Sequence, residues 1–253
     1  MKFVSLVFSP TGGTRAVGEA LASAWDGPVQ AWDLTRRDFD GSALQLAGED
    51  LAVIAAPAFA GRAPALAVQR LATVRGNGAR CVVAAVYGNR AYEDTLVELC
   101  DAARQAGFRV IAGVAAVAEH SILRQYATGR PDAADRAALR DFGRQILEKA
   151  RRGGAPPPPL PRHRPYTQAG APALLPSAGP GCSRCGLCAE NCPAGAIPRE
   201  DPAATDGSLC IYCMRCVSIC PQQARSFDRQ KAAALAEKLR PVCSVPKANE
   251  LFL

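Results

Sequence analysis

The chain has 253 residues, 49% of them hydrophobic and 21% charged, and its 30 Lys and Arg against 23 Asp and Glu give a formal net charge of +7. This composition is ordinary for a folded globular protein and argues against extended disorder. No apolar run approaches the roughly 18–20 residues that a membrane-spanning helix needs. No basic stretch is interleaved with aromatic residues, so the positive charge does not indicate a nucleic-acid partner.

The N-terminus and the cysteines indicate the expected compartment. The first nine residues contain one lysine and a very short apolar stretch, which does not fit a secretion signal, so we expect a cytoplasmic protein. Eleven cysteines is an odd number, and eight of them lie between positions 182 and 220. In a chain without an export signal, such crowding favours metal binding over a disulfide framework.

Apolar strand-like runs alternate with helical patterns over the first 152 residues. The predicted strands cover residues 2–8, 29–33, 51–56, 80–87 and 109–117, and the predicted helices cover residues 14–25, 63–74, 92–107 and 132–149. Strands rich in Val, Ile and Ala with little polar alternation are those buried on both faces. The alternation therefore predicts a doubly wound, five-stranded parallel sheet with helices on both sides.

A proline-rich segment follows the last of these helices. Residues 153–180 include the run Pro156-Pro157-Pro158-Pro159 and show almost no apolar periodicity. Such proline density favours a stiff, extended polyproline conformation. We therefore expect a first domain over residues 1–152, a linker over residues 153–180 and a second domain over residues 181–253.

Eight cysteines after this linker form two runs with identical spacing. Each run reads Cys-x2-Cys-x2-Cys-x3-Cys-Pro, and the second follows the first at a constant offset of 28 residues, as from Cys182 to Cys210. This duplicated spacing is typical of the bacterial ferredoxin motif, in which the fourth cysteine of each run ligates the other 4Fe-4S cluster. We therefore expect two clusters, one on Cys182, Cys185, Cys188 and Cys220 and the other on Cys210, Cys213, Cys216 and Cys192.

Zinc is the alternative metal for such cysteines. Structural zinc sites typically take four ligands from two separated Cys-x2-Cys pairs, which fits two runs of four cysteines with a trailing proline poorly. Cys81, Cys100 and Cys243 lie outside the runs. We expect these three to be buried or incidental thiols.

The first predicted strand leads directly into a turn that precedes a helix. The turn reads Ser9-Pro10-Thr11-Gly12-Gly13-Thr14. Backbone N–H groups and hydroxyls in such a turn face an anion at a helix N-terminus, where the helix dipole favours negative charge. The turn therefore predicts a phosphate-binding loop, with a plain strand-to-helix turn as the alternative.

This turn resembles the FMN phosphate loop of flavodoxins, and the whole chain resembles fusions of a flavodoxin-like domain with a two-cluster ferredoxin domain. The segments at residues 57–62, 86–92 and 119–121, after the third, fourth and fifth predicted strands, carry the resemblance further. The resemblance implies an α/β flavodoxin-like sheet plus a small α+β bacterial two-cluster ferredoxin domain. It also implies that FMN is bound by Ser9, Thr11, Gly12, Gly13 and Thr14 at its phosphate and by Phe59, Tyr87, Gly88, Asn89 and Tyr92 around its ring.

The resemblance implies a protein that moves electrons between FMN and two 4Fe-4S clusters and exchanges them with redox partner proteins. No residue is predicted to be catalytic. The alternative is an FMN-dependent reductase of a small organic substrate, fed by the ferredoxin domain, for which His120 is the candidate acid or base. In either case, we expect the ferredoxin domain to dock over the loops at residues 59–62, 87–92 and 119–121, because ligands sit at the carboxyl ends of such strands.

Overall fold

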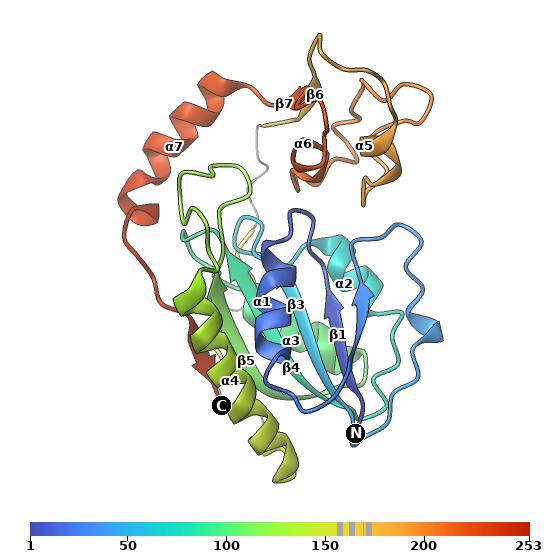
Figure 1. Cartoon of the computed structure of the whole chain (residues 1–253), viewed down its shortest axis with the longest axis vertical. Coiled ribbons are helices and arrows are strands. Elements are labelled where there is room, and N and C mark those ends of the chain that lie inside the picture. Colours follow the sequence, from blue (N-terminus) through green and yellow to red (C-terminus); the bar gives the residue numbers. More distant parts are fainter. Residues whose placement is uncertain (156–158, 162–164, 169, 171–173) are drawn as a thin grey trace.

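The structure is a computed structural model, and it describes residues 1–155, 159–161, 165–168, 170 and 174–253. Strands and helices alternate along its first part (Figure 1). The strands are β1 (Phe3–Val7), β2 (Val29–Asp33), β3 (Leu51–Pro57), β4 (Arg80–Tyr87) and β5 (Arg109–Val117). The helices are α1 (Gly13–Ala22), the short 3-10 helix η1 (Gly41–Ala43), α2 (Ala65–Leu71), α3 (Thr95–Gln105) and α4 (Ala133–Arg151).

The first five strands form a parallel sheet in the order β2-β1-β3-β4-β5. This is the doubly wound order of flavodoxin-like folds, whose switch point lies between β1 and β3. The predicted five-stranded parallel sheet is therefore present. The structure adds a sixth strand, β8 (Glu250–Phe252), which pairs antiparallel with β5 and is not predicted from the sequence.

Helices cover both faces of the sheet, because successive residues of each strand point to opposite sides. On one face, α1 and α4 bury side chains such as Leu21 and Ile146. On the other face, α2 and α3 bury side chains such as Leu71 and Leu99, together with Cys81 and Cys100. The two thiols are thus buried core residues, as expected.

The described residues of the linker pack against the first part of the chain. The Thr167 backbone N–H and hydroxyl donate to an Asp94 carboxylate oxygen at 2.7 and 2.8 Å. The Arg62 guanidinium donates to the Thr167 carbonyl at 2.9 Å and lies 4.7 Å from the centre of the Tyr166 ring. Pro156–Pro158 of the predicted polyproline run lie outside the described residues.

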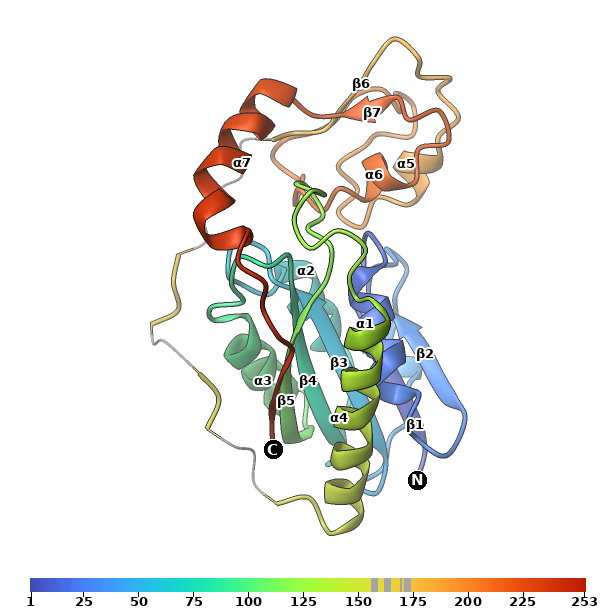
Figure 2. The same ribbon diagram turned by 60° about the vertical axis from the view of Figure 1, so that its left-hand side comes forward.

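The second part of the chain lies above the carboxyl ends of the sheet strands (Figures 1 and 2). It contains a short antiparallel pair and two single-turn helices, followed by one longer helix. These elements are β6 (Ser177–Ala178), α5 (Leu187–Glu190), α6 (Arg215–Ser218), β7 (Arg225–Ser226) and α7 (Arg229–Cys243).

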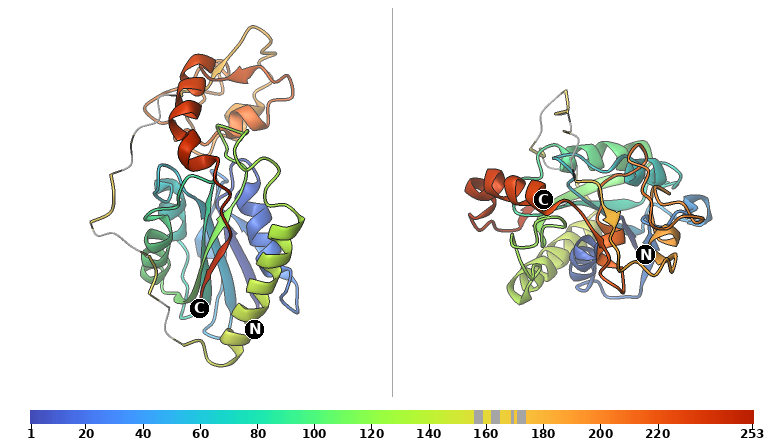
Figure 3. Two further views of the ribbon diagram at one scale, coloured as in Figure 1. Left: turned by 90° about the vertical axis from the view of Figure 1, so that its left-hand side faces the viewer. Right: turned by 90° about the horizontal axis from the view of Figure 1, so that it is seen from above.

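The C-terminal segment returns from α7 to the sheet (Figure 3). The Tyr126 hydroxyl donates to the Ala236 carbonyl of α7 at 2.7 Å. The Val117 N–H, at the end of β5, donates to the Asn249 side-chain oxygen at 2.9 Å. Glu250–Phe252, which we expected to belong to the second domain, are therefore part of the first sheet.

Candidate redox site

The eight cysteines of the two runs line two separate cavities. Each cavity takes the first three cysteines of one run and the fourth of the other, which is the grouping expected for crossed ligation. We call them the first cavity and the second cavity. The first cavity is lined by Cys182, Cys185, Cys188 and Cys220, and the second by Cys192, Cys210, Cys213 and Cys216.

The backbone repeats along with the cysteines. Arg184 and Tyr212, which precede the second cysteine of each run, both have left-handed φ angles, 56° and 54°. The residues that precede α5 and α6 are also left-handed: Gly186 at 79° and Met214 at 60°. Left-handed residues in turns direct successive N–H groups into a concavity that binds anions. The two runs therefore have the same local conformation as well as the same spacing.

Backbone N–H groups reach three of the sulfurs. The Ala196 N–H donates to Cys192 Sγ and the Ala224 N–H to Cys220 Sγ, each at 3.3 Å, at corresponding positions of the two runs. The Tyr212 N–H donates to Cys210 Sγ at 3.4 Å. Such hydrogen bonds stabilise thiolates and are one of the means by which proteins set cluster potentials.

Burial governs the protonation of the free thiols. It raises the pKa of Cys213 to about 12 and that of Cys216 to about 11. At Cys220 burial acts in the same direction, but donation from the N–H groups of residues 222, 224 and 225 lowers the pKa below its ordinary value. Because metal ligands must be thiolates, loading the second cavity would release protons.

The cysteines are not arranged around a single ion. Among the described residues, no group of three or more His, Cys, Asp or Glu side chains lies close enough to hold one metal ion. Zinc would need sulfurs about 2.3 Å from one centre, whereas a cubane cluster has a separate iron for each of its four thiolates. The grouping of four cysteines from both runs in each cavity fits the crossed ligation of 4Fe-4S clusters.

The loop at residues 9–14 joins β1 to α1 and uses its serine internally. The Ser9 N–H donates to the Thr35 hydroxyl at 2.7 Å, and the Ser9 hydroxyl accepts from the Arg15 N–H at 2.9 Å. Gly12 has a φ of 97°, a conformation that favours glycine. The N–H groups of residues 11 to 14 donate to no atom of the described residues. These four donors, at the start of a helix, fit a phosphate group.

The space beyond this loop is small. A cavity of about 60 Å³ lies at the carboxyl ends of the strands, between the loop and Phe59, Gly88 and His120. Sites for drug-sized ligands are usually about 300 Å³ or larger. The residues therefore fit the phosphate end of FMN, whereas its ring would need this cavity to widen.

The predicted ring contacts divide into two sets. Phe59, Tyr87 and Gly88 line the cavity. Asn89 and Tyr92 instead contact the C-terminal segment, where Asn89 Nδ2 donates to the carbonyls of Cys243 and Val245 at 2.6 and 2.9 Å. The Tyr92 hydroxyl donates to a Glu250 carboxylate oxygen at 3.2 Å, and its ring lies 5.4 Å from the Tyr87 ring.

His120 lies at this cavity as a neutral donor. Its Nδ1 accepts from the N–H groups of Ile122 and Leu123, each at 3.2 Å. Burial lowers the pKa of His120 to about 4. The imidazole is therefore neutral at pH 7, and its proton is on Nε2 because Nδ1 is an acceptor.

The second cavity adjoins the first part of the chain. Arg215, between Cys213 and Cys216, donates to the Pro10 carbonyl of the 9–14 loop at 3.2 Å. Arg70 of α2 donates to the Pro193 carbonyl, next to Cys192, at 2.7 Å. Ile211, next to Cys210, packs against the α2 and α3 face of the sheet. These contacts tie the second cavity to the end of the sheet where the 9–14 loop lies.

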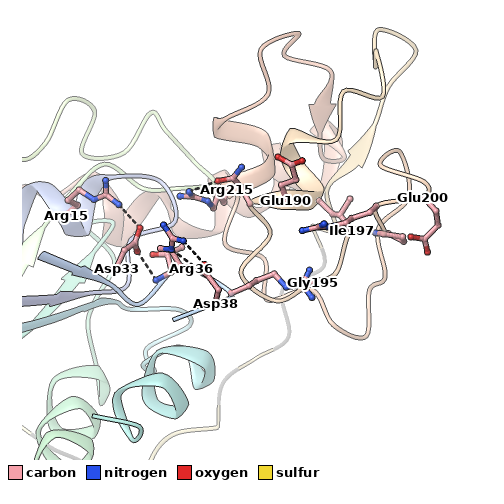
Figure 4. Close-up of a pocket in the computed structure, with 14 residues that line it drawn as sticks. Arg15, Asp33, Arg36, Asp38, Glu190, Gly195, Ile197, Glu200 and Arg215 are labelled. Carbon is pink, nitrogen blue, oxygen red and sulfur yellow. Dashed lines mark hydrogen bonds and ion pairs between the residues drawn. The ribbon is translucent and has the colours of Figure 1, made fainter. Parts of the chain in front are cut away.

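A cleft of about 840 Å³ separates the two parts beside this junction (Figure 4). Two of its five arginines are paired with acids: Arg15 with Asp33 at 2.9 Å and Arg36 with Asp38 at 2.6 Å. The sequence suggests Arg15 because it follows the predicted phosphate loop. It does not suggest Arg36 and Arg37 of the first part or Arg199 and Arg215 of the second, and these two pairs come together only through the docking of the two parts.

Comparisons with known proteins agree with these two regions. Residues 181–225 match the family model of the 4Fe-4S dicluster domain. A comparison with curated protein sequences finds no match.

Several solved structures resemble the first part. An archaeal flavodoxin aligns with a TM-score of 0.41 and 16% identity over 60% of this chain and 99% of that one. A flavodoxin from Megasphaera elsdenii aligns with a TM-score of 0.40 and 18% identity over 58% and 99%. Rubredoxin:oxygen oxidoreductase from Desulfovibrio gigas aligns with a TM-score of 0.43 and 14% identity over 61% and 37%.

The family match assigns iron-sulfur character to residues 181–225, and the strand order itself gives the sheet its flavodoxin-like arrangement. Within the described part of the chain, no helix is both long and apolar enough to cross a membrane.

Proposed function

We propose that this protein is an electron carrier that holds FMN at the 9–14 loop and one 4Fe-4S cluster in each cysteine cavity. The observation that supports it best is the contact of the second cavity with that loop through Arg215 and Pro10. It brings a site suited to a cluster next to a site suited to a flavin phosphate. When bound, a flavin exchanges one or two electrons and each cluster exchanges one. Such a chain can therefore couple two-electron transfer to one-electron transfer.

The chain's own residues would hold the flavin at one end. The N–H groups of Thr11, Gly12, Gly13 and Thr14 would donate to the phosphate, and the hydroxyl of Thr14 would add another donor. Phe59 and Gly88 would border the ring, with the His120 Nε2 proton as a fixed donor at its edge. Because His120 stays neutral at pH 7, it would add no charge beside the flavin.

The two cavities differ in their access to solvent. Cys192 and Cys213 of the second cavity are buried, whereas Cys185 of the first cavity is exposed. Leu187, two residues after Cys185, is 37% exposed. We therefore assign the second cavity to exchange with the flavin and the first cavity to exchange with an external redox partner.

The reductase alternative has less support. A substrate would have to stack on the flavin ring, and the cavity at that position measures only about 60 Å³ before any ring is placed there. His120, the candidate acid or base, does not titrate near pH 7, because burial lowers its pKa to about 4. An electron carrier needs neither a substrate pocket nor a proton donor that titrates near pH 7.

Metal and flavin analysis of anaerobically purified protein tests the proposal. Eight cysteine ligands predict about eight irons and eight inorganic sulfides per chain, together with the visible spectrum of 4Fe-4S clusters. Zinc in place of iron, or about four irons with a single cluster signal, would contradict it. Added FMN should bind more tightly than riboflavin, because only FMN carries the phosphate that the 9–14 loop would bind. Equal affinities for the two flavins would exclude this loop as the phosphate site.

The assignment of the second cavity has its own test. In the Arg215→Ala variant, the flavin should oxidise or reduce the clusters more slowly in a stopped-flow measurement, because the contact with Pro10 is lost. Arg199→Ala is the matched control, since Arg199 lines the same cleft without any hydrogen bond or ion pair to the described residues. Equal rates in both variants and the wild type would show that electrons take another route.

A further inference from the structure

Two corresponding residues of the cysteine runs are both buried but differ in charge. The fifth residue after the last cysteine of the first run is Ile197, and its counterpart in the second run, at the same offset of 28 residues, is Arg225. Both side chains are buried, each with 2% of its surface exposed. Ile197 packs in the apolar cluster around Cys188 and Cys192. The duplicated fold therefore buries an apolar side chain at one position and a guanidinium at the other.

The Arg225 guanidinium is held by neutral acceptors. Its Nη1 donates to the Thr205 hydroxyl at 2.7 Å, and its Nη2 donates to the carbonyls of Ala204, at 2.9 Å, and Pro202. Its Nε is buried without a hydrogen-bond partner among the described residues. No carboxylate in the described part of the chain forms an ion pair with it. A buried charge with this environment is costly unless an anion lies nearby.

The position of this cation relates it to both cavities. Arg225 and its acceptor Pro202 line the first cavity, and its acceptor Thr205 lines the second. The backbone of Arg225 is fixed by pairing with Ala178 in the short β6–β7 ladder. The guanidinium is therefore held between the two groups of cysteines, where no other buried charge of the described residues lies.

We propose that the buried charge of Arg225 raises the reduction potentials of both clusters. The proposal rests on the proposed function, since it needs a cluster in each cavity. A cluster with four thiolates carries about −2 when oxidised and about −3 after it accepts one electron. A fixed cation between the clusters stabilises the reduced form more than the oxidised form, and in a buried setting this difference is weakly screened.

The other possible role of Arg225 is purely mechanical. Its donors hold the segment at residues 202–205, and Thr205 in turn donates to the Pro176 carbonyl at 2.8 Å. A mechanical role needs the donors, whereas a role in setting potentials needs the charge. Substitutions that separate donors from charge therefore distinguish the two.

The test is a redox titration of the full-length, anaerobically purified protein, followed by electron paramagnetic resonance of both clusters. Arg225→Gln keeps donors without charge, and Arg225→Lys keeps the charge. At a given potential, Arg225→Gln should lower the reduced-to-oxidised ratio of each cluster by tenfold or more, a shift of about 59 mV for a one-electron couple. Arg225→Lys should remain close to the wild type.

Thr205→Val is the structural control, because it removes one acceptor of the guanidinium and leaves the charge in place. Its potentials should match those of the wild type. If Arg225→Gln does not retain iron, citrulline at position 225 replaces it, since citrulline has the shape of arginine and no charge. Unchanged potentials in a loaded neutral variant, or equal shifts in Thr205→Val, overturn the proposal.

Failure of the proposed function gives a different result in the same experiment. Wild-type protein without two cluster signals would refute the two-cluster proposal and, with it, the role of Arg225. Wild-type protein with both signals, and with potentials that do not respond to the charge at position 225, would refute the role of Arg225 alone.

Discussion

The sheet and the cysteine region of this molecule are stabilised in different ways. The sheet buries fully enclosed side chains such as Leu6, Leu21 and Ile146 in two apolar layers. The cysteine region has one small apolar cluster, made of Cys188, Ala189, Cys192, Ala196 and Ile197, in which two members are metal-ligand candidates. A cluster of that size cannot offset the conformational entropy of the segment that it serves. The first region can fold by burial, whereas we expect the second to need its clusters in order to fold.

The largest effect should follow from the loss of one cysteine ligand. In Cys192→Ser, we expect the cluster on Cys210, Cys213 and Cys216 to be lost or strongly perturbed, because Cys192 lines that cavity. Iron per chain should fall, and circular dichroism should show the C-terminal region unfolding while the sheet remains. Cys243→Ala is the control, since Cys243 is outside both cavities. Loss of the other cluster's signal alone would contradict crossed ligation.

A substitution in the core of the first region should lower the stability of that region and leave the iron content unchanged. Ile146 is fully buried between α4 and the sheet, so Ile146→Ala should lower the free energy of unfolding of the first region by about 3 kcal/mol. Iron per chain should not change. Val242→Ala, at a side chain that is 47% exposed, should have little effect on the free energy of unfolding or on iron per chain. If iron falls in parallel with stability in Ile146→Ala, the two regions do not fold independently.

The 9–14 loop lies where the two regions meet, and its effect should be smaller. Gly12 has a φ of 97°, and a valine there would strain the turn that presents the N–H groups. We expect Gly12→Val to weaken FMN binding about tenfold, which equals about 1.4 kcal/mol. Fluorescence titration measures the affinity, and thermal unfolding checks that the sheet is intact. An unchanged affinity would show that the phosphate lies elsewhere.

The smallest effect concerns an ion pair at the start of α4. Burial raises the pKa of Asp135, but hydrogen bonds from the Arg130 guanidinium and the Asp132 N–H outweigh this effect. The pKa of Asp135 therefore lies below its ordinary value. This stabilisation is present above the unfolded-state pKa of about 3.9 and is lost as pH falls through the folded-state pKa.

Asp135→Asn should therefore lower the free energy of unfolding by about 1 kcal/mol at pH 7, and this difference should vanish in strong acid. Urea unfolding at several pH values measures it. Asp141→Asn, on the same helix and in an exposed pair with Arg144, should be close to neutral at every pH. A difference that persists below the folded-state pKa would exclude the charge as its source.

Local sequence patterns predicted the sheet because its strands are buried on both faces. The predicted bounds of β2, β4 and β5 agree with the structure, and the helix ends differ by a few residues, since helix ends depend on caps and packing. Strand β8 was not predicted. It has three residues, and its register depends on β5 and on the Asn249 contact with Val117, which no local pattern encodes.

The parts of the candidate site that depend on residue spacing along the sequence were predictable. The two cysteine groups follow from the duplicated runs, and the loop at Gly12 follows from its composition. The roles of Asn89, Arg215 and Arg225 depend on contacts between distant segments. Asn89 is an instance of this: its sequence position suggested a ring contact, whereas its side chain holds the segment after α7.

The return of the C-terminus to the sheet changes the topology of the whole protein. Because β8 pairs with β5, the cysteine region is an insertion within the α/β fold, with one connection after α4 and another through α7. A module attached at one end can swing over a wide volume, but one attached at both ends can only rock about the line that joins its two attachment points. Removal of Glu250–Phe252 would reduce the second attachment to side-chain contacts such as those of Asn89 and Asn249, with the same side chains at each redox site.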